Sequence, residues 1–343
     1  MSTLQRMDLD DVDWHALDAY SDRTVFQTRE WLNFVASTQR ANPVLARVWT
    51  DGRPVGYFTG LVTRRFGVRI LGSPFRGWST AYMGFNLEPG VAREPLLVDL
   101  RKFAFDELGC LHLELMDRFV RPQAALAPCF RRDLLSGYEI DLTRTEGELF
   151  GAMAPACRRC IRAAERAGLF VEEARDVAFV DDYYGQLEEV FARQGLVPTY
   201  PRQRVESLVQ QLLPTGNLLL LRVRTADGRC IATGVVPAMS GVAYFWGGAS
   251  WRAFQHLRPN ELMHWSAMRY WQARGVARYD MGGGGAYKAK YGGTPIDVPW
   301  LRTSRFAAIE QLRSQASHLV SLRQRIRGSR RAAIAGRSRV SAE

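Results

Sequence analysis

The sequence predicts an α+β fold built from two copies of one unit: a helix, antiparallel hairpins, then a second helix and a strand. Two observations predict it, because a hairpin pattern and a helix–strand pattern each occur twice, in the same order, along the chain. The length of 343 residues leaves room for two domains of about 150 residues each.

The first repeated pattern is a tight turn. Residues 50–56 read TDGRPVG and residues 226–232 read ADGRCIA, and apolar runs lie on both sides of each Asp-Gly pair. An Asp-Gly pair between two apolar runs is typical of a β-hairpin. We therefore expect an antiparallel hairpin at the corresponding place in each half.

The second repeated pattern is a helix followed by a strand. Residues 94–110 show helical spacing of apolar side chains, end at Gly109 and precede LHLELM. Residues 260–276 show the same spacing, end at Gly275 and precede ARYDMG. Glycine just after the last turn is typical of helix ends, and apolar alternation is typical of strands. Both halves are therefore expected to contain this helix and this strand.

These patterns suggest three segments. We expect a first domain at residues 1–150, a second at residues 151–310, and a basic C-terminal helix or tail at residues 311–343. From Arg323 onward the chain has seven arginines and one acidic residue, and the whole chain has a net charge of +11. Such a run is typical of an arm that contacts nucleic acid or an anionic membrane, and a purely solubilising tail is an equal alternative.

Composition points to a globular cytoplasmic protein. Hydrophobic residues make up 47% and charged residues 24%, no apolar run reaches the roughly 18 residues that span a bilayer, and the N-terminus lacks the apolar stretch of a signal peptide. Five scattered cysteines suggest a reducing compartment. Cys157 and Cys160 form a CxxC without a second pair, so an ordinary helix is favoured there over a metal or redox site.

The stretch MGGGGAYKAKYGG, residues 281–293, contains two of the three lysines in a chain with forty-three arginines. Lysine is a compact point charge, whereas arginine is a wide planar fork, so lysine suits a site with room for one atom. If the stretch is extended, Lys290 falls on the other side of the chain from Lys288, and a structural role is favoured for Lys290. For Lys288 the structural alternative is a helix cap or a surface ion pair.

Several short motifs together resemble the FemABX family of aminoacyl-tRNA-dependent transferases. The resemblance covers roughly residues 25–300 and implies two tandem GNAT-like (acyl-CoA N-acyltransferase) domains with mixed sheets flanked by helices. The motifs are FQTREW at residues 26–31, the basic stretch at residues 157–171, RQG within residues 192–195, the hairpin at residues 227–250, YDMGG at residues 279–283 and YKAKYG at residues 287–292.

The resemblance implies that an aminoacyl group moves from aminoacyl-tRNA to an amine. Such a transfer passes through a tetrahedral intermediate with a negatively charged oxygen, which a fixed cation stabilises. The family pattern assigns this role to Lys288, with Tyr287 positioning it and Tyr291, the second aromatic of the motif, at the substrate.

Further residues are expected to bind substrate. Trp31 and Trp246 are predicted to line the acceptor cleft, with core packing as the alternative, and Arg193 is a candidate for a phosphate of the acceptor. Asp280 is expected to orient a group nearby, although an acid before glycines more often caps a turn. Family members that bind a peptidoglycan precursor carry a lysine after the tryptophan where this chain has Asn33, so a small peptide or metabolite amine is an equally suitable acceptor.

No resident cofactor or metal is expected, and aminoacyl-tRNA is the expected co-substrate. Metal motifs such as HExxH, the GxSxG elbow and the P-loop are missing from the sequence. The stretch before Asn260 has no glycine, and Pro259 lacks an N–H, which argues against a CoA pyrophosphate. The alternatives are an acyl-CoA-dependent N-acyltransferase and a non-catalytic RNA- or membrane-binding protein. We expect a small amine-bearing acceptor, peripheral contact with an anionic membrane, and no stable protein partner.

Overall fold

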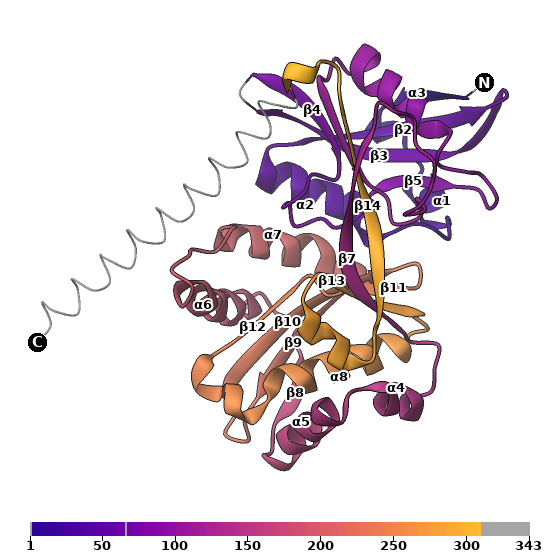
Figure 1. Cartoon of the computed structure of the whole chain (residues 1–343). Coiled ribbons are helices and arrows are strands. Elements are labelled where there is room, and N and C mark those ends of the chain that lie inside the picture. Colours follow the sequence, from indigo (N-terminus) through magenta and orange to yellow (C-terminus); the bar gives the residue numbers. More distant parts are fainter. Residues whose placement is uncertain (1, 66, 310–343) are drawn as a thin grey trace, which may run out of the picture.

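The computed structural model describes residues 2–65 and 67–309 and shows one continuous mixed sheet with helices on its faces (Figure 1). The basic segment predicted at residues 311–343 lies outside the described residues. The strands are β1 (Ser2–Met7), β2 (Asn42–Thr50), β3 (Arg53–Arg65), β4 (Val68–Ser73), β5 (Gly84–Leu87), β6 (His112–Met116), β7 (Arg131–Asp141), β8 (Phe170–Glu173), β9 (Leu218–Arg224), β10 (Cys230–Met239), β11 (Val242–Tyr244), β12 (Gly247–Ser250), β13 (Arg278–Gly283) and β14 (Thr294–Ser304).

Eight α-helices and several short turns accompany the strands in the described part of the chain. The α-helices are α1 (Trp14–Asp18), α2 (Arg29–Gln39), α3 (Leu96–Lys102), α4 (Glu146–Ala152), α5 (Pro155–Arg166), α6 (Phe179–Ala192), α7 (Arg202–Leu212) and α8 (Pro259–Gln272). The turns are the 3-10 helices η1 (Leu9–Asp11), η2 (Val25–Gln27), η4 (Leu213–Thr215), η5 (Arg252–Leu257) and η6 (Ala286–Tyr291), with a π-helical turn η3 (Phe103–Glu107).

The predicted repeat is confirmed strand by strand. In the first half, which we define as β1 to β6, β3 pairs antiparallel with β2, β4 and β5, and β4 pairs in parallel with β6. In the second half, from α4 to β13, β10 pairs antiparallel with β9, β11 and β12, and β11 pairs in parallel with β13. The two halves therefore share one topology.

The turn residues and glycines that predicted these strands and helices lie where the strands and helices end. The hairpin β2–β3 turns at Asp51 and Gly52, both with positive φ, and the hairpin β9–β10 turns at Gly228 with φ +85°. After the helices of the repeat, Gly109 and Gly275 adopt the left-handed conformation with φ +62° and +76°. Glycine has no Cβ to clash in this conformation, so these positions stop the helices where the sequence predicted.

The two halves exchange their last strands. Strand β7 follows the first half in the chain but pairs with β13 of the second half. Strand β14 follows the second half but pairs with β6 of the first, and β7 and β14 pair with each other. Figure 1 shows these two long strands running between the lobes. The domain boundary predicted at residue 150 falls within α4, and neither predicted domain forms its sheet from its own strands alone.

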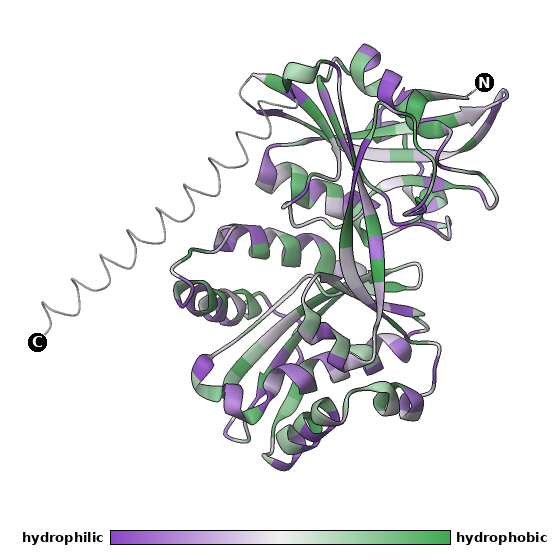
Figure 2. Cartoon of the chain, viewed as in Figure 1, coloured by the Kyte–Doolittle hydropathy of each residue, from purple (hydrophilic) through white to green (hydrophobic). Residues whose placement is uncertain are grey.

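Hydrophobic residues, green in Figure 2, recur along the strands and in the helices beside them. One core cluster belongs to both halves, since Phe26 and Trp31 near α2 pack in the same cluster as Tyr183 of α6 and Val209 of α7. The halves are thus joined by a shared core as well as by strands. None of the described helices is both long and apolar enough to span a membrane.

Candidate active site

Lys288 is held at the end of β13 by two backbone carbonyl groups. Helix η6 follows the glycine run and returns the lysine toward the strand it has just left. Its Nζ donates hydrogen bonds to Met281 O at 2.7 Å and to Gly283 O at 2.6 Å, and only 8% of the residue is exposed. An ammonium carries three donors. Among the described residues no third acceptor bonds Nζ, so one N–H is left for a ligand.

Two glycines allow the chain to make this return. Gly282 has φ +71°, and a Cβ there would lie 3.0 Å from Tyr244 Oη. Gly292 has φ +81°, and a Cβ there would lie 2.9 Å from Ala152 O. Any other residue would be strained at both positions and crowded by its neighbours. The glycines before and after Lys288 therefore fix the path of the loop.

The sequence allowed an extended conformation for the stretch that carries the lysines. The structure shows a 3-10 helix there instead. Lys288 N donates to Gly285 O at 2.9 Å, which closes the turn, and Gly292 ends it. Lys290 forms an ion pair with Glu261 of α8, with Nζ 2.7 Å from Oε1. Lys290 thus ties the loop to α8.

Burial strengthens the electrostatic effect of the Lys288 ammonium on nearby atoms. Partial removal from water lowers the pKa of Lys288, and the nearby Asp280 carboxylate opposes this shift. Charges interact more strongly where water is excluded, so the Lys288 ammonium acts more strongly on a neighbouring oxygen than an exposed lysine would. The two carbonyls hold it in place without neutralising it.

Asp280 joins the two halves beside this lysine. Its carboxylate is fully buried, accepts a hydrogen bond from Tyr82 Oη at 2.7 Å, and lies 3.7 Å from Arg118 Nη1. Gly282 N also donates to Oδ1 at 2.7 Å, so Asp280 caps the turn as well. Burial raises the pKa of Asp280, and Arg118 opposes that shift. Arg118 in turn forms an ion pair with Glu139 of β7.

Tyr82, Arg118 and Glu139 were missed by the sequence analysis. They lie far from Asp280 in the chain, and no motif connects them with it. Tyr82 lies in the loop between β4 and β5, and the Arg118 guanidinium lies 5.5 Å from the Tyr82 ring centroid. Only the pairing of β7 with β13 brings Glu139 opposite Asp280.

The two tyrosines of the lysine motif have different surroundings. Tyr287 is 58% exposed, and its ring centroid lies 5.9 Å from Lys288 Nζ. An exposed aromatic ring beside a buried charge is a surface on which a planar ligand can stack. Tyr291 is buried and packs against the His264 ring at 4.7 Å. Tyr291 therefore supports the loop from within the core.

Trp31 does not line a cleft. Its side chain has no exposed surface, its ring packs edge-to-face on Phe26 at 4.7 Å, and its Nε1 donates to Thr80 Oγ1 at 2.9 Å. The predicted substrate contact is therefore corrected to a core position. The reason is that the helical face carrying Trp31 covers the sheet and meets α7.

Trp246 and Arg193 lie apart from the lysine loop. Trp246 is half-buried between the halves, donates from Nε1 to Ser79 O at 2.7 Å, and packs on Tyr200 at 5.4 Å. Arg193 is exposed at the C-terminal end of α6. Within the described residues no hydrogen bond or ion pair links either side chain to Lys288. Asp280, a predicted substrate contact, and Tyr287, predicted to position the lysine, both lie beside Lys288.

His264 of α8 is a second buried group that the sequence analysis missed. Its Nδ1 lies 3.0 Å from Tyr279 Oη, and its ring packs on Phe245 at 4.4 Å. Burial, with smaller effects of Lys288 and Lys290, lowers the pKa of His264 to about 3. The imidazole is therefore neutral at physiological pH. Its signal in the sequence is a histidine between Met263 and Trp265 on an otherwise apolar helix face.

This histidine predicts how stability depends on pH. The folded pKa lies below the unfolded value of about 6.5, so the unfolded chain binds the proton more readily. Stability from the neutral imidazole is thus present above about pH 6.5 and lost toward pH 3, by about 1.4 kcal/mol per pH unit. Urea unfolding of wild type and His264→Gln at pH 7, 6 and 5 should show a shallower pH dependence in the variant.

The exposed His15 provides the matched control for this measurement. His15→Gln makes the same replacement at an exposed histidine and is measured alongside His264→Gln. Equal pH dependence in wild type and His264→Gln would contradict the assignment of a neutral buried imidazole. Comparing each variant with wild type at the same pH cancels the contributions of the other titrating groups.

The turn before α8 has few free backbone amides for a pyrophosphate. Phe254 N and Arg258 N both donate to carbonyls within the preceding turn, and Arg252 N donates to Glu189 Oε1 at 2.9 Å. Pro259, the first residue of α8, has no N–H. A pyrophosphate bound at a helix N-terminus needs several free N–H donors. The turn before α8 therefore offers a pyrophosphate fewer donors than a glycine-rich loop would.

Other chemistry is not indicated in the described part of the chain. No group of three or more His, Cys, Asp or Glu side chains comes close enough there to hold a metal ion. Cys157 and Cys160 lie on α5, and burial raises the pKa of Cys157 to about 11. A thiol with a raised pKa is a poor nucleophile.

Comparisons with known proteins agree with this architecture. Residues 154–291 match the family described as an acetyltransferase (GNAT) domain. The fold is similar to the crystal structure of FemX, at 13% identity, 86% of this chain, 96% of that chain and a TM-score of 0.67. No curated protein matches the sequence.

Two further solved structures share the fold. One is a tandem GNAT protein from the clavulanic acid biosynthesis pathway, at 12% identity, 89% of this chain, 98% of that chain and a TM-score of 0.51. The other is L-PGS from Bacillus licheniformis, at 12% identity, 85% of this chain, 93% of that chain and a TM-score of 0.53. The predicted α+β fold with tandem GNAT-like units is thereby confirmed.

Proposed function

We propose that this protein transfers an aminoacyl group from aminoacyl-tRNA to an amine and that Lys288 stabilises the oxyanion of the reaction. The observation that carries the proposal is the buried Lys288 ammonium, which two carbonyls fix in place and which keeps one N–H for a ligand. The motifs shared with the FemABX family and the likeness of the fold to FemX support it.

The reaction needs few groups from the protein. The acceptor amine attacks the ester carbonyl carbon of the donor, and the carbonyl oxygen becomes negatively charged. The free N–H of Lys288 donates to this oxygen. When the intermediate collapses, the ester C–O bond breaks and an amide forms, and the leaving ribose oxygen takes up the proton that the amine has lost. Orientation and oxyanion stabilisation provide the rate enhancement.

Asp280 and Tyr287 complete the proposed site. Asp280 keeps a negative charge near Lys288, which favours the protonated lysine against burial. The exposed ring of Tyr287 lies beside Lys288 and offers a surface for the terminal base of the donor or for the acceptor. We assign Arg193 and Trp246 to the distal part of the acceptor. The acceptor is a peptidoglycan precursor or another amine, and the transfer assay described next can compare the two.

The donor is tested directly with purified protein. We expect product to form when labelled aminoacyl-tRNA and an amine are supplied, and RNase treatment of the tRNA to abolish it. The physical reason is that the turn before α8 already uses the amides of Arg252, Phe254 and Arg258 within the protein, which leaves few donors for CoA. Turnover with acetyl-CoA that survives RNase treatment would overturn the proposal and favour the acyl-CoA-dependent N-acyltransferase. Lys102→Ala changes an exposed lysine and serves as the control variant, which should form product as wild type does.

A further inference from the structure

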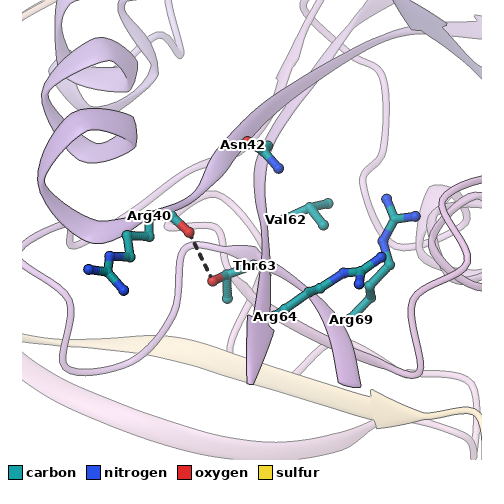
Figure 3. A pocket seen from close by; sticks show the side chains of 6 residues that line it. All are labelled: Arg40, Asn42, Val62, Thr63, Arg64 and Arg69. Carbon is teal, nitrogen blue, oxygen red and sulfur yellow. Dashed lines mark hydrogen bonds between the residues drawn. The ribbon is translucent and has the colours of Figure 1, made fainter. Parts of the chain in front are cut away.

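A cavity lined by three arginines lies in the first half, apart from the lysine loop (Figure 3). Its volume is about 510 Å³, and it forms where α2 ends and where β3 and β4 meet in a hairpin. None of the residues proposed for catalysis takes part in it. The lining residues are Arg40, Asn42, Val62, Thr63, Arg64 and Arg69.

Two of these arginines lie directly opposite each other in the sheet. Arg64 of β3 and Arg69 of β4 are cross-strand partners, and Figure 3 shows their side chains running side by side. Like charges in directly opposite positions destabilise a strand pair. An anion bound between the two guanidinium groups would remove this repulsion.

No acidic side chain in the described part of the chain forms an ion pair with Arg40, Arg64 or Arg69. Arg40 and Arg64 are exposed and Arg69 is half-buried, whereas the buried arginines of the described chain, Arg23 and Arg222, are paired with acidic side chains. Arg222, for example, contacts Asp176 at 2.8 Å and Asp182 at 2.7 Å. The cavity therefore concentrates positive charge that the described residues do not balance.

The third arginine is fixed on the other side of the cavity. Arg40 ends α2 in the left-handed conformation, with φ 54°, which is uncommon for a residue with a Cβ. Thr63 Oγ1 donates to Arg40 O at 3.2 Å and pins this turn to β3, as the dashed line in Figure 3 marks. The backbone of Arg40 is thus held at the cavity rim, opposite Arg64 and Arg69.

Another arginine of the described chain, Arg305, lies near the cavity and is paired with Asp106. Leu111 N donates to Arg69 O at 2.9 Å, and Arg305 N donates to Leu111 O at 3.0 Å. Arg305 therefore lies one strand away from the cavity. The chain that follows has seven arginines from residue 323 onward.

We propose that the three-arginine cavity binds phosphate groups of an RNA backbone, specifically of the tRNA that carries the aminoacyl group. This rests on the proposed function, which makes RNA the carrier of the donor. Guanidinium groups bind phosphate oxygens through two parallel hydrogen bonds. The Arg64 and Arg69 guanidinium groups lie together in Figure 3 and can hold one phosphate between them, while the Arg40 side chain points away from them and is available to a further phosphate.

The position of the cavity favours a long polyanion. Strands β6, β14 and β7 lie between β4 and β13, which separates the arginines from the Lys288 loop by four spacings of about 4.8 Å across the sheet. The cavity lies near the Ser304 end of β14 and the loop near its Thr294 end, which adds about 30 Å along the strand. A small phosphate ester at the reacting centre would not reach across this distance. An RNA arm reaches across it, since double-stranded nucleic acid carries a charge about every 1.7 Å along its axis.

Binding of deacylated tRNA tests the proposal without turnover. The double variant Arg64→Gln/Arg69→Gln should bind this tRNA at least tenfold more weakly than wild type at low salt. The slope of log affinity against log salt should fall by about 1–2, because each lost phosphate contact removes about 0.7–0.9. Its melting temperature should equal or exceed that of wild type, because the cross-strand repulsion is relieved.

The control removes the same charge outside the cavity. Arg6→Gln/Arg29→Gln changes two exposed arginines of the same half, and its tRNA affinity should stay within about threefold of wild type. Equal affinity and slope in the two double variants would overturn the cavity proposal. The cavity variant is also tested with vesicles of anionic phospholipid. If it loses vesicle binding but keeps wild-type tRNA binding, the RNA proposal is wrong and the cavity is a membrane site.

The cavity proposal and the proposed function fail separately. If charged tRNA supports transfer but the cavity variant binds tRNA like wild type, only the cavity proposal is wrong. If acetyl-CoA supports transfer and the cavity variant still loses tRNA affinity, the donor assignment is wrong and the RNA site stands.

Discussion

Lys288→Ala is expected to lower kcat by about 10²–10³ and to leave KM close to wild type, because the proposed bond to the oxyanion exists mainly in the transition state. Steady-state kinetics with labelled aminoacyl-tRNA measure both constants. The loop should stay folded, since Gly282 and Gly292 set its path and Lys290 keeps its ion pair with Glu261. Thermal melting of the variant close to wild type would establish this.

Lys288→Arg should lower kcat almost as much as Lys288→Ala. The carbonyls of Met281 and Gly283 lie 2.7 and 2.6 Å from a single nitrogen, and a planar fork of donors does not fit the space of one ammonium. Lys102→Ala removes an exposed lysine and should have no effect on kcat. Wild-type activity in Lys288→Arg would reduce the lysine to a general positive charge, and wild-type activity in Lys288→Ala would remove it from the mechanism.

Arg118→Met is expected to destabilise the protein by about 3–5 kcal/mol, the usual effect of breaking a buried ion pair from one side. The guanidinium lies between Asp280 and Glu139, and its side chain is 8% exposed. Without it, two acidic side chains are left buried between the halves. Urea unfolding at pH 7 measures the loss.

The loss should depend on pH in a definite direction. Burial raises the folded pKa of Asp280, and removing Arg118 removes the charge that opposes this shift. A raised folded pKa means that stability is present at low pH and is lost as the pH rises through that pKa. The difference between Arg118→Met and wild type should therefore be larger at pH 7 than at pH 5.

A neighbouring arginine provides the control for this experiment. Arg121 forms an ion pair with Glu94, but its side chain is 77% exposed, so Arg121→Met should change stability by less than about 1 kcal/mol. In a double-mutant cycle, Asp280→Asn should recover part of the loss caused by Arg118→Met. Additive effects of the two substitutions would show that Arg118 and Asp280 do not interact.

The elements that the sequence predicted are those that local patterns specify. The Asp-Gly hairpins and the helices that end at Gly109 and Gly275 depend on residues a few positions apart, and the structure confirms them. Repetition of the same order then predicted a repeated topology. Lys288 could be singled out because it is unusual in composition and lies between glycines with required conformations.

The surroundings of Lys288 were less predictable, because they depend on contacts between distant segments. Tyr82 and Arg118 reach Asp280 from the other half, and the sequence gives no spacing that would connect them. Trp31 was interpreted as a cleft residue because a tryptophan in a motif fits both a core and a binding site. The 3-10 turn around Lys288 depends on the hydrogen bond of its amide to Gly285 O.

The exchange of β7 and β14 has a consequence for how the chain is made. Strand β6 ends at Met116, but its partner β14 begins only at Thr294, so the ribosome must add the intervening chain before the first lobe can close. At about 5–20 residues per second, this takes on the order of ten seconds or more. During that time the edge of β6 has no native partner and can pair with other nascent chains. This protein therefore completes its first lobe only late in its synthesis, and premature termination before residue 294 would leave that lobe without its last strand.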